Sequence, residues 1–131
     1  MAQIQRSKQK KRTIKEIRRG DIYLVSFDPT VGHEIKKTRP AVVVQNDIGN
    51  KYNSIVIVAA ITSTISKAAH PIMVVVEPSS ANGLGSPSTV RLDQIRSVDK
   101  MRLVRRLGKL DASSMEAVNQ AILISLGLVD D

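Results

Sequence analysis

The segment 34–39, EIKKTR, places a carboxylate and a guanidinium group five residues apart, immediately before a short apolar run. Glu34 can accept a proton, and Arg39 can make paired hydrogen bonds to phosphate oxygens. Thr62 ends a second apolar run, where its hydroxyl can donate another hydrogen bond. These groups suit RNA cleavage, because RNA carries its own nucleophile, the 2′-hydroxyl, and needs only a base, an acid and donors to the phosphate.

The same residues also have a structural interpretation. Glu34 and Arg39 can form an exposed salt bridge, which contributes about 0–1 kcal/mol, and Thr62 can simply end its strand. Pro40 restricts Arg39 to an extended conformation in either case. Spacing alone therefore leaves the catalytic and the structural alternatives open.

The composition excludes several other chemistries. The chain has no cysteine, which excludes disulfides, thiolate zinc sites and a cysteine nucleophile. Its two histidines, His33 and His70, lie in separate loops without acidic residues at metal-ligand spacing, so we predict neither a metal nor a cofactor. The stretch 82–89, NGLGSPST, lacks the Lys-Ser/Thr pair and the strand-to-helix context of a phosphate-binding loop.

The net charge of +8 is concentrated near the N-terminus. Residues 1–19 hold eight Lys or Arg and one Glu, a net of +7, whereas the remaining 112 residues hold twelve basic and eleven acidic side chains, a net of +1. We therefore predict a domain over 20–131, preceded by a flexible basic extension over 1–19. The extension is either a solvated tail or a source of sequence-independent attraction to phosphates.

Length and hydropathy predict a single-domain soluble protein. A chain of 131 residues supports one core of aliphatic side chains, because it contains only one Phe, two Tyr and no Trp. The apolar segment SIVIVAAITSTI is shorter and more polar than the roughly 18 residues that span a bilayer. The basic start has no apolar region typical of a secretory signal, so we expect a cytoplasmic protein.

Periodicity and turn residues predict a run of strands followed by a helix. The expected strands span residues 21–27, 41–45, 54–62, 71–77 and 89–99. The continuous apolar runs 41–45 and 54–62 are typical of central strands, and we expect them to pair antiparallel. Alternation fails near Gln94, which indicates a bulge there. The segment 102–110, RLVRRLGKL, fits either a short strand or a turn of helix.

The segment 111–128 has the clearest helical pattern in the sequence. Ser113 and Glu116 have the spacing of a capping box. Apolar residues recur at helical intervals along the segment: Met115, Val118, Ile122 and Leu126. Many short strands followed by a lone helix predict a mainly β, α+β fold, in which a small, strongly curved sheet or barrel is closed by a C-terminal helix.

Three ordered stretches resemble the MazF/PemK family of bacterial toxins, which are sequence-directed endoribonucleases of toxin–antitoxin modules. They are GDIYLVSFDPTVGHEIKKTRPAVVVQND at 20–47, IVIVAAIT at 55–62 and STVRLDQIRSVDKMRL at 88–103. The resemblance runs from about Gly20 to Leu128. It implies an SH3-like curved barrel of about five to seven strands with a C-terminal helix. It also implies a homodimer that cuts single-stranded mRNA without a metal, leaves a 2′,3′-cyclic phosphate and a 5′-hydroxyl, and is neutralised by a cognate antitoxin.

The resemblance also assigns roles to particular residues. Arg39 corresponds to the Arg of the family's Arg-Pro motif and Thr62 to the Thr that ends its central strand, so these two are the expected catalytic pair. Glu34 matches an acid that serves as general base in some members. His33 stands where relatives often carry a small Ser, and we interpret it as a loop residue; the alternative is direct participation in proton transfer.

Recognition of RNA requires further side chains. Single-stranded RNA is normally read by stacking on aromatic rings and by hydrogen bonds to base edges. Phe27 is the best stacking candidate, although it can equally be a core residue. Asn46 and Gln94 can read base edges, and Arg96 and Lys36 can bind phosphates; each can instead be an ordinary turn or surface residue.

Two functions from other classes remain open at the level of the sequence. The first is a toxin of the same fold that binds and poisons a topoisomerase and has no nuclease chemistry. The second is a non-catalytic RNA-binding module that relies on its basic extension. The first would not need Arg39 and Thr62, and the second would lose RNA binding when residues 1–19 are removed.

Overall fold

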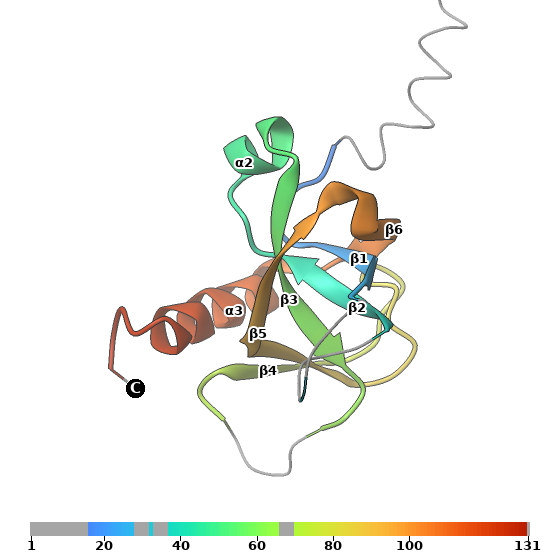
Figure 1. The fold of residues 1–131 in the computed structure, drawn as a ribbon. Helices are drawn as coiled ribbons and strands as arrows, with labels where there is room; N and C mark the ends of the chain where they lie inside the picture. Colours follow the sequence, from blue (N-terminus) through green and yellow to red (C-terminus); the bar gives the residue numbers. More distant parts are fainter. Residues whose placement is uncertain (1–15, 28–31, 33–36, 66–69, 131) are drawn as a thin grey trace, which may run out of the picture.

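A computed structural model describes residues 16–27, 32, 37–65 and 70–130 (Figure 1). Within these residues, an antiparallel sheet of six strands bends around its own core, and a C-terminal helix packs against it. The strands are β1 Asp21–Ser26, β2 Thr38–Val43, β3 Ile55–Thr62, β4 Met73–Val76, β5 Ser88–Asp99 and β6 Leu103–Lys109. The helices are α2 Asp47–Tyr52, the 3-10 turn η1 Lys100–Arg102 and α3 Ala112–Ser125.

The strand order is β4-β5-β3-β2-β1-β6. The two long apolar runs are therefore central, and β2 pairs antiparallel with β3 as predicted. The six strands and the C-terminal helix confirm the expected α+β architecture. The sheet does not close into a full barrel, because β4 and β6 remain its two edges in the described part of the chain.

The strand β2 begins three residues earlier than predicted and ends at Val43 rather than Gln45. The start of β2 was not predicted because charged Arg39 and imino Pro40 are not typical strand residues. In the structure, both pair with β1. The turn-rich segment that follows β2 contains the short helix α2. Its N-cap is Asn46, whose side chain accepts a hydrogen bond from the Gly49 N–H at 2.8 Å.

The predicted irregularity in β5 is confirmed. Ala59 of β3 pairs with Ile95, whereas the next residue, Ala60, pairs with Arg91, so the register shifts around Gln94. The ambiguous segment 102–110 forms mostly a strand, β6, which follows η1 and lies beside β1.

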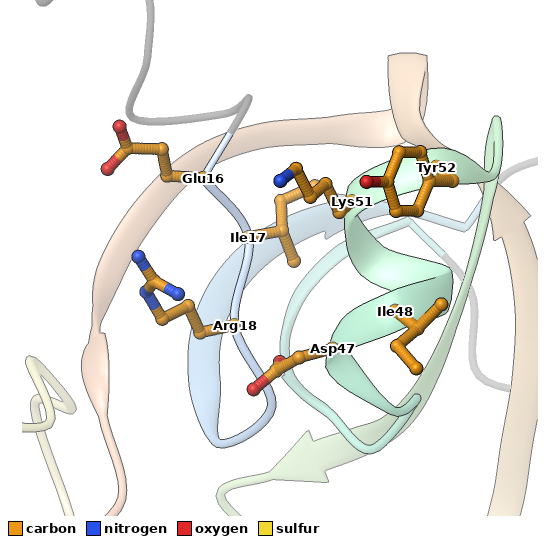
Figure 2. Close-up of a pocket in the computed structure, with 7 residues that line it drawn as sticks. All are labelled: Glu16, Ile17, Arg18, Asp47, Ile48, Lys51 and Tyr52. Carbon is orange, nitrogen blue, oxygen red and sulfur yellow. The ribbon is translucent and has the colours of Figure 1, made fainter.

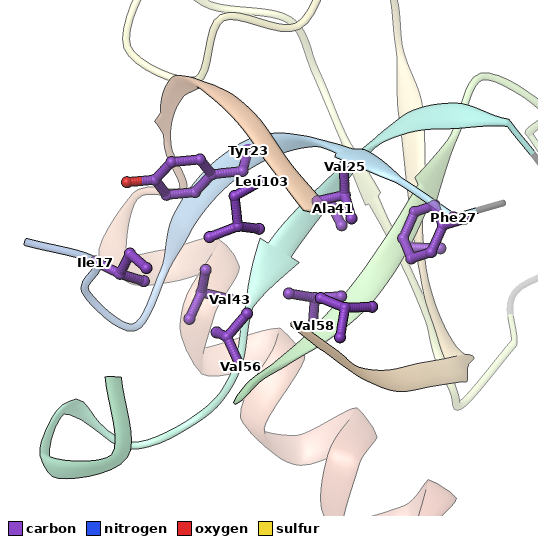
Figure 3. Packing of buried hydrophobic residues seen from close by; sticks show 11 residues of the cluster. Ile17, Tyr23, Val25, Phe27, Ala41, Val43, Val56, Val58 and Leu103 are labelled. Carbon is purple, nitrogen blue, oxygen red and sulfur yellow. The ribbon is translucent and has the colours of Figure 1, made fainter. Parts of the chain in front are cut away.

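Side chains of the central strands alternate between the two faces of the sheet, and they are buried on both faces. One face carries Tyr23 and Val25 of β1 and Phe27, which directly follows β1. These side chains pack with β2 and β3 (Figure 3). On the other face, Ile22 packs in a second cluster that includes Val118 of α3. Continuous apolar runs are expected for strands buried on both faces.

The helix α3 lies against β4 and β5 (Figure 1). The predicted capping box is wrong: the N-cap is Asp111, whose carboxylate accepts a hydrogen bond from the Ser114 N–H at 2.7 Å. Ser113 lies inside the first turn instead. Leu126 is the C-cap and is exposed, so the buried stripe of the helix ends before it.

The described chain begins with a segment that belongs to the folded body. Ile17 is 4% exposed and packs in the same cluster as Tyr23 (Figure 3). The Arg19 N–H donates to Asp47 at 2.7 Å, and its Nε donates to the Val44 carbonyl at 2.9 Å. Residues 17–19 therefore pack with the domain, and the role of the basic residues before them stays a prediction.

No helix among the described residues is long and apolar enough to cross a membrane.

Candidate active site

Strands β2 and β3 diverge at one end of the sheet. Their pairing ends at Ala41 and Ala60. Beyond that point, Thr38–Pro40 pair with β1, while β3 continues along β5. Pro40 has no N–H to donate to a ladder, which fits its place where the β2–β3 pairing stops. The divergence leaves an opening beside the three residue pairs, Ala41–Ala60 to Val43–Val58, that join the two strands.

The strand register places Arg39 and Thr62 on opposite sides of this opening. Ala41 pairs with Ala60 in antiparallel register, so the residues two positions further along each strand are Arg39 and Thr62. Residues two apart in a strand point to the same face. Both side chains therefore belong to the face of Ala41 and Ala60.

A cavity of about 220 Å³ lies at this opening, and both Arg39 and Thr62 line it. Arg39 is exposed and Thr62 is half-exposed. The other lining comes from the ends of β2 and β3, from Leu107 of β6 and from the loop between β4 and β5. The two residues that the sequence selected as a catalytic pair thus meet at one solvent-accessible cavity.

The hydroxyl of Thr62 is an unused hydrogen-bonding group beside this cavity. Its Oγ1 is buried and has no hydrogen-bond partner among the described residues. A buried unpaired polar group costs about 1–3 kcal/mol. Because Oγ1 is buried, it can reach a ligand in the cavity only after rotation about the Cα–Cβ bond of Thr62 to another staggered position.

The loop 78–87 lines the cavity through residues that sequence motifs do not single out. Gly83, Gly85 and Ser86 all contribute to the lining. Motif matching passes over this stretch, because it does not have the pattern of a nucleotide phosphate loop. Its glycine-rich composition is the available signal, but its closeness to Arg39 follows from the tertiary fold.

Phe27 and Arg96 contact each other at the edge of the first core cluster. The guanidinium carbon of Arg96 lies 5.3 Å from the centroid of the Phe27 ring. Phe27 is 1% exposed, so in this conformation its ring has no free face for a base. The Nη1 of half-exposed Arg96 is buried and has no hydrogen-bond partner within the described residues, and phosphate binding by Arg96 stays a prediction. Neither residue lines the cavity of Arg39.

Asn46 and Gln94 are not brought to this cavity. Asn46 lies beyond the opposite end of β2 from Arg39, and its side-chain oxygen is already engaged in capping α2. The strand from Arg39 to Val43 alone spans roughly 13 Å. Gln94 is half-exposed in the irregular part of β5. Base reading by these two amides stays a prediction.

Glu34, Lys36 and His33 lie outside the described residues. Their proposed roles in proton transfer and phosphate binding stay predictions. Among the residues that the structure does describe, no group of three or more His, Asp or Glu side chains is placed to hold a metal ion. Metal independence likewise stays a prediction.

Two larger cavities lie near the start of the described chain. One of about 540 Å³ lies between Glu16–Arg18 and α2, with Ile48 and Tyr52 on its helical side (Figure 2). Two acids, Glu16 and Asp47, line it. Asp47 is a poor base, because the hydrogen bond from the Arg19 N–H holds the pKa of that carboxyl below its usual value.

The second of these cavities, of about 360 Å³, is mostly basic. Its buried acid, Asp21, accepts a hydrogen bond from the Arg18 N–H at 2.9 Å and pairs with Arg106 at 3.2 Å. Asp47 in the first cavity and Asp21 in the second are therefore both engaged in hydrogen bonds within the protein. Cavity size does not identify the reactive site in this protein.

Comparisons with known proteins show which family the chain is similar to. Residues 18–126 match the family model described as PemK-like, MazF-like toxin of type II toxin-antitoxin system. The chain is 49% identical over 112 residues to Endoribonuclease MazF of Staphylococcus saprophyticus, covering 86% of this chain and 92% of the relative.

Solved structures share the fold. MazF from Deinococcus radiodurans superposes with a TM-score of 0.71 at 26% identity, covering 85% of this chain and 96% of the other. A mycobacterial endoribonuclease in complex with its cognate antitoxin gives a TM-score of 0.71 at 23% identity, covering 88% and 99%, and this likeness concerns the fold alone. The family match covers most of the chain, and the chain therefore belongs to the PemK-like, MazF-like toxins of type II toxin–antitoxin systems.

Proposed function

We propose that this protein is an endoribonuclease toxin that cuts single-stranded mRNA at a short sequence, without a metal or cofactor. The products are a 2′,3′-cyclic phosphate and a 5′-hydroxyl. The class of activity follows from family membership and from the 49% identity to a relative named Endoribonuclease MazF. The observation that carries the proposed site is the cavity lined by both Arg39 and Thr62.

The proposed reaction uses the 2′-hydroxyl of the RNA as nucleophile. Its oxygen attacks the adjacent phosphorus, an O2′–P bond forms, and the P–O5′ bond breaks. The proton of the 2′-hydroxyl passes to a base, for which we propose Glu34, and the departing O5′ takes up a proton to become the 5′-hydroxyl. A general acid supplies the proton that O5′ gains, and the base holds the proton that the 2′-hydroxyl loses. Every heavy atom of the products comes from the RNA, so no water is consumed in this step.

Arg39 and Thr62 act on the phosphate in this scheme. The non-bridging oxygens gain negative charge as the phosphorane forms, and a guanidinium is suited to bind two of them at once. The hydroxyl of Thr62 donates a further hydrogen bond. Its lack of a partner among the described residues supports this role, because the donor gains a partner when the phosphate binds.

The test is incubation of the purified protein with a long synthetic RNA in EDTA, followed by mapping of the cut ends. We expect cleavage with a cyclic phosphate at the 3′ end of each upstream fragment. Arg39→Ala and Thr62→Ala should each slow cleavage by about 100-fold to 1000-fold. Arg105→Ala is the matched control, because this exposed β6 arginine does not line the cavity and should cut at the parent rate.

Each failure of this experiment has a distinct meaning. Cleavage that requires added metal would overturn the metal-free mechanism. RNA that stays intact with the parent protein would overturn the nuclease assignment. In that case, retained RNA binding would favour a non-catalytic module, and absent RNA binding would favour a toxin that acts on another protein.

We further propose that the protein acts as a homodimer in the cytoplasm and is neutralised by a cognate antitoxin. The family description, which is that of a toxin of a type II toxin-antitoxin system, supports the last point. The region of α2 and η1 supports the homodimer, because Ile48, Tyr52 and Met101 are strongly exposed there. Their neighbours Asp47, Lys51, Asp99 and Lys100 carry charges of both signs, which two copies can pair across a twofold axis. Sedimentation analysis of the protein alone checks its oligomeric state.

A further inference from the structure

The loop 78–87, which connects β4 to β5, is held in shape by its own hydrogen bonds. Asn82 is 5% exposed, and its Oδ1 accepts from the N–H groups of Ser79 and Leu84, each at 3.0 Å. Its Nδ2 donates to the Glu77 carbonyl at 2.8 Å. Leu84 packs into the core cluster beneath α3. The conformation of the loop is therefore set by the protein and does not require RNA.

Two glycines allow this loop to lie directly on β6. A Cβ at Gly83 would lie 2.1 Å from the Leu107 carbonyl oxygen, and a Cβ at Gly108 would lie 2.2 Å from the Ala81 carbonyl oxygen. That Ala81 oxygen also accepts a hydrogen bond from the Lys109 N–H at 3.0 Å. Any side chain at either glycine would force the loop and strand apart. The contact makes the loop a fixed wall.

Gly85 has the opposite environment. A Cβ built there meets no atom of the described residues within 4 Å, and its φ lies outside the left-handed region. Neither steric contact nor backbone conformation therefore requires glycine at this position. Gly85 nevertheless lines the cavity that contains Arg39 and Thr62. A side chain at position 85 would enter open space at the same cavity.

We propose that the loop 78–87 is a rigid wall of the RNA cleft and that Gly85 sets the width of the nucleotide subsite beside the scissile phosphate. This inference rests on the proposed function and adds to it a determinant of substrate size. A phosphate held by Arg39 carries a nucleoside on each side, and one of them must occupy space along the cavity wall. The missing side chain at Gly85 provides that space.

A series of substitutions of increasing size tests this proposal. Gly85→Ala, Gly85→Val and Gly85→Leu should remain folded, with thermal midpoints close to that of the parent, because a Cβ at position 85 meets open space and the larger groups extend from it at the cavity. Cleavage measured as kcat/KM should fall progressively, reaching about 10- to 100-fold at Leu. Ser80→Leu is the matched control, because Ser80 is exposed on the same loop and does not line the cavity. It should cut at the parent rate.

Binding and base preference separate a narrowed subsite from a general structural effect. Once the cut site of the parent is mapped, the same RNA with a 2′-deoxy sugar at that site cannot be cut and reports affinity alone. Its affinity should fall in parallel with kcat/KM across the series. With a randomised RNA, Gly85→Ala should lower the ratio of purines to pyrimidines beside the cut, because purines are larger.

Several results would overturn the inference. If the parent cuts RNA and Gly85→Leu cuts at the same rate with the same base preference, position 85 does not limit the subsite. If Gly85→Ala unfolds the protein, the space at this position is not open. If the parent itself leaves RNA intact, the proposed function fails, and the inference fails with it.

Discussion

The hydroxyl of Thr62 should lower the stability of the folded protein and raise the rate of RNA cleavage. Its Oγ1 is buried without a partner among the described residues, at a cavity that Arg39 also lines. A buried unpaired group in a native structure calls for an explanation, and a catalytic role is one of those known. At the scale of one residue, stability and function should therefore respond in opposite directions when the hydroxyl is removed.

Thr62→Val tests this opposition, because it replaces the hydroxyl by a methyl group of similar shape. We expect the free energy of unfolding to rise by up to about 1–3 kcal/mol, since no unpaired hydroxyl remains in the folded state. Cleavage should fall by about 100-fold to 1000-fold. Urea unfolding and RNA cleavage measure the two effects. A variant that is destabilised and still active would contradict both assignments.

Tyr23 is the residue whose ionisation should shape stability at alkaline pH. Burial, with a smaller contribution from the Asp21 carboxylate, raises the pKa of Tyr23 to about 12 from its ordinary value of 10.0. Between these values the unfolded chain loses the phenolic proton while the folded protein keeps it. The stability that this difference contributes is complete below pH 10 and is lost as the pH rises to about 12.

Tyr23→Phe removes the ionisable group and keeps the ring. The variant should lose less stability than the parent between pH 10 and pH 12, and the two should show parallel profiles below pH 10. Thermal midpoints measured across this range check the expectation. Identical alkaline slopes would show that Tyr23 does not titrate differently in the folded and unfolded states.

At the scale of elements, α3 depends on one cap. The Asp111 carboxylate accepts a hydrogen bond from the Ser114 N–H, and this contact lowers the pKa of Asp111. Asp111→Ala should lower the thermal midpoint, whereas Ser113→Ala, the matched control from the first turn, should leave it nearly unchanged. The difference should shrink as the pH falls through the pKa of Asp111, because the protonated group is a weaker acceptor. A larger effect at Ser113 would restore the capping box.

The strands show which elements a sequence can predict. The runs in β1 and β3 are recognisable because their β-branched and aliphatic residues are buried on both faces. The start of β2 escapes prediction because Arg39 and Pro40 do not resemble strand residues, although pairing with β1 keeps them extended. The helix α2 escapes it because its Asn, Asp and Gly residues are typical of turns.

The candidate site could be predicted only in part. The resemblance of sequence motifs identified Arg39 and Thr62, and the strand register then places them at one opening. Gly85 has no side chain, so a prediction based on reactive side chains does not identify it. Its place beside Arg39 depends on the Asn82 hydrogen bonds and on contact between the loop and β6, which join segments far apart in the sequence.

At the scale of the whole molecule, charge is unevenly distributed. Residues 1–15 contain six Lys or Arg and no acid. The described chain then begins at Glu16, beside the basic cavity formed with Arg18, Arg106 and Lys109. An RNA strand bound near the basic cavity would interact with the positive charge of the cavity and with that of residues 1–15. The basic residues should raise affinity for RNA without determining where it is cut.

Deletion of residues 1–15 tests this expectation. The affinity for an uncleavable RNA should weaken at low salt, and the salt dependence should become shallower by about 0.7 in log–log slope for each phosphate that the deleted segment neutralises. The mapped cut sites should not change. An unaltered slope would identify the basic segment as a solvated tail, and complete loss of cleavage would give it a role in catalysis or folding.

The most direct test of the central claim is a double-mutant cycle of Arg39→Ala and Thr62→Ala on one mapped RNA, measured as single-turnover cleavage. If both side chains act on the same phosphodiester, the double variant should be about as slow as the slower single variant, because groups that act as a unit are not additive. Single penalties that multiply in the double variant, or single variants that cut at the parent rate, would contradict the account.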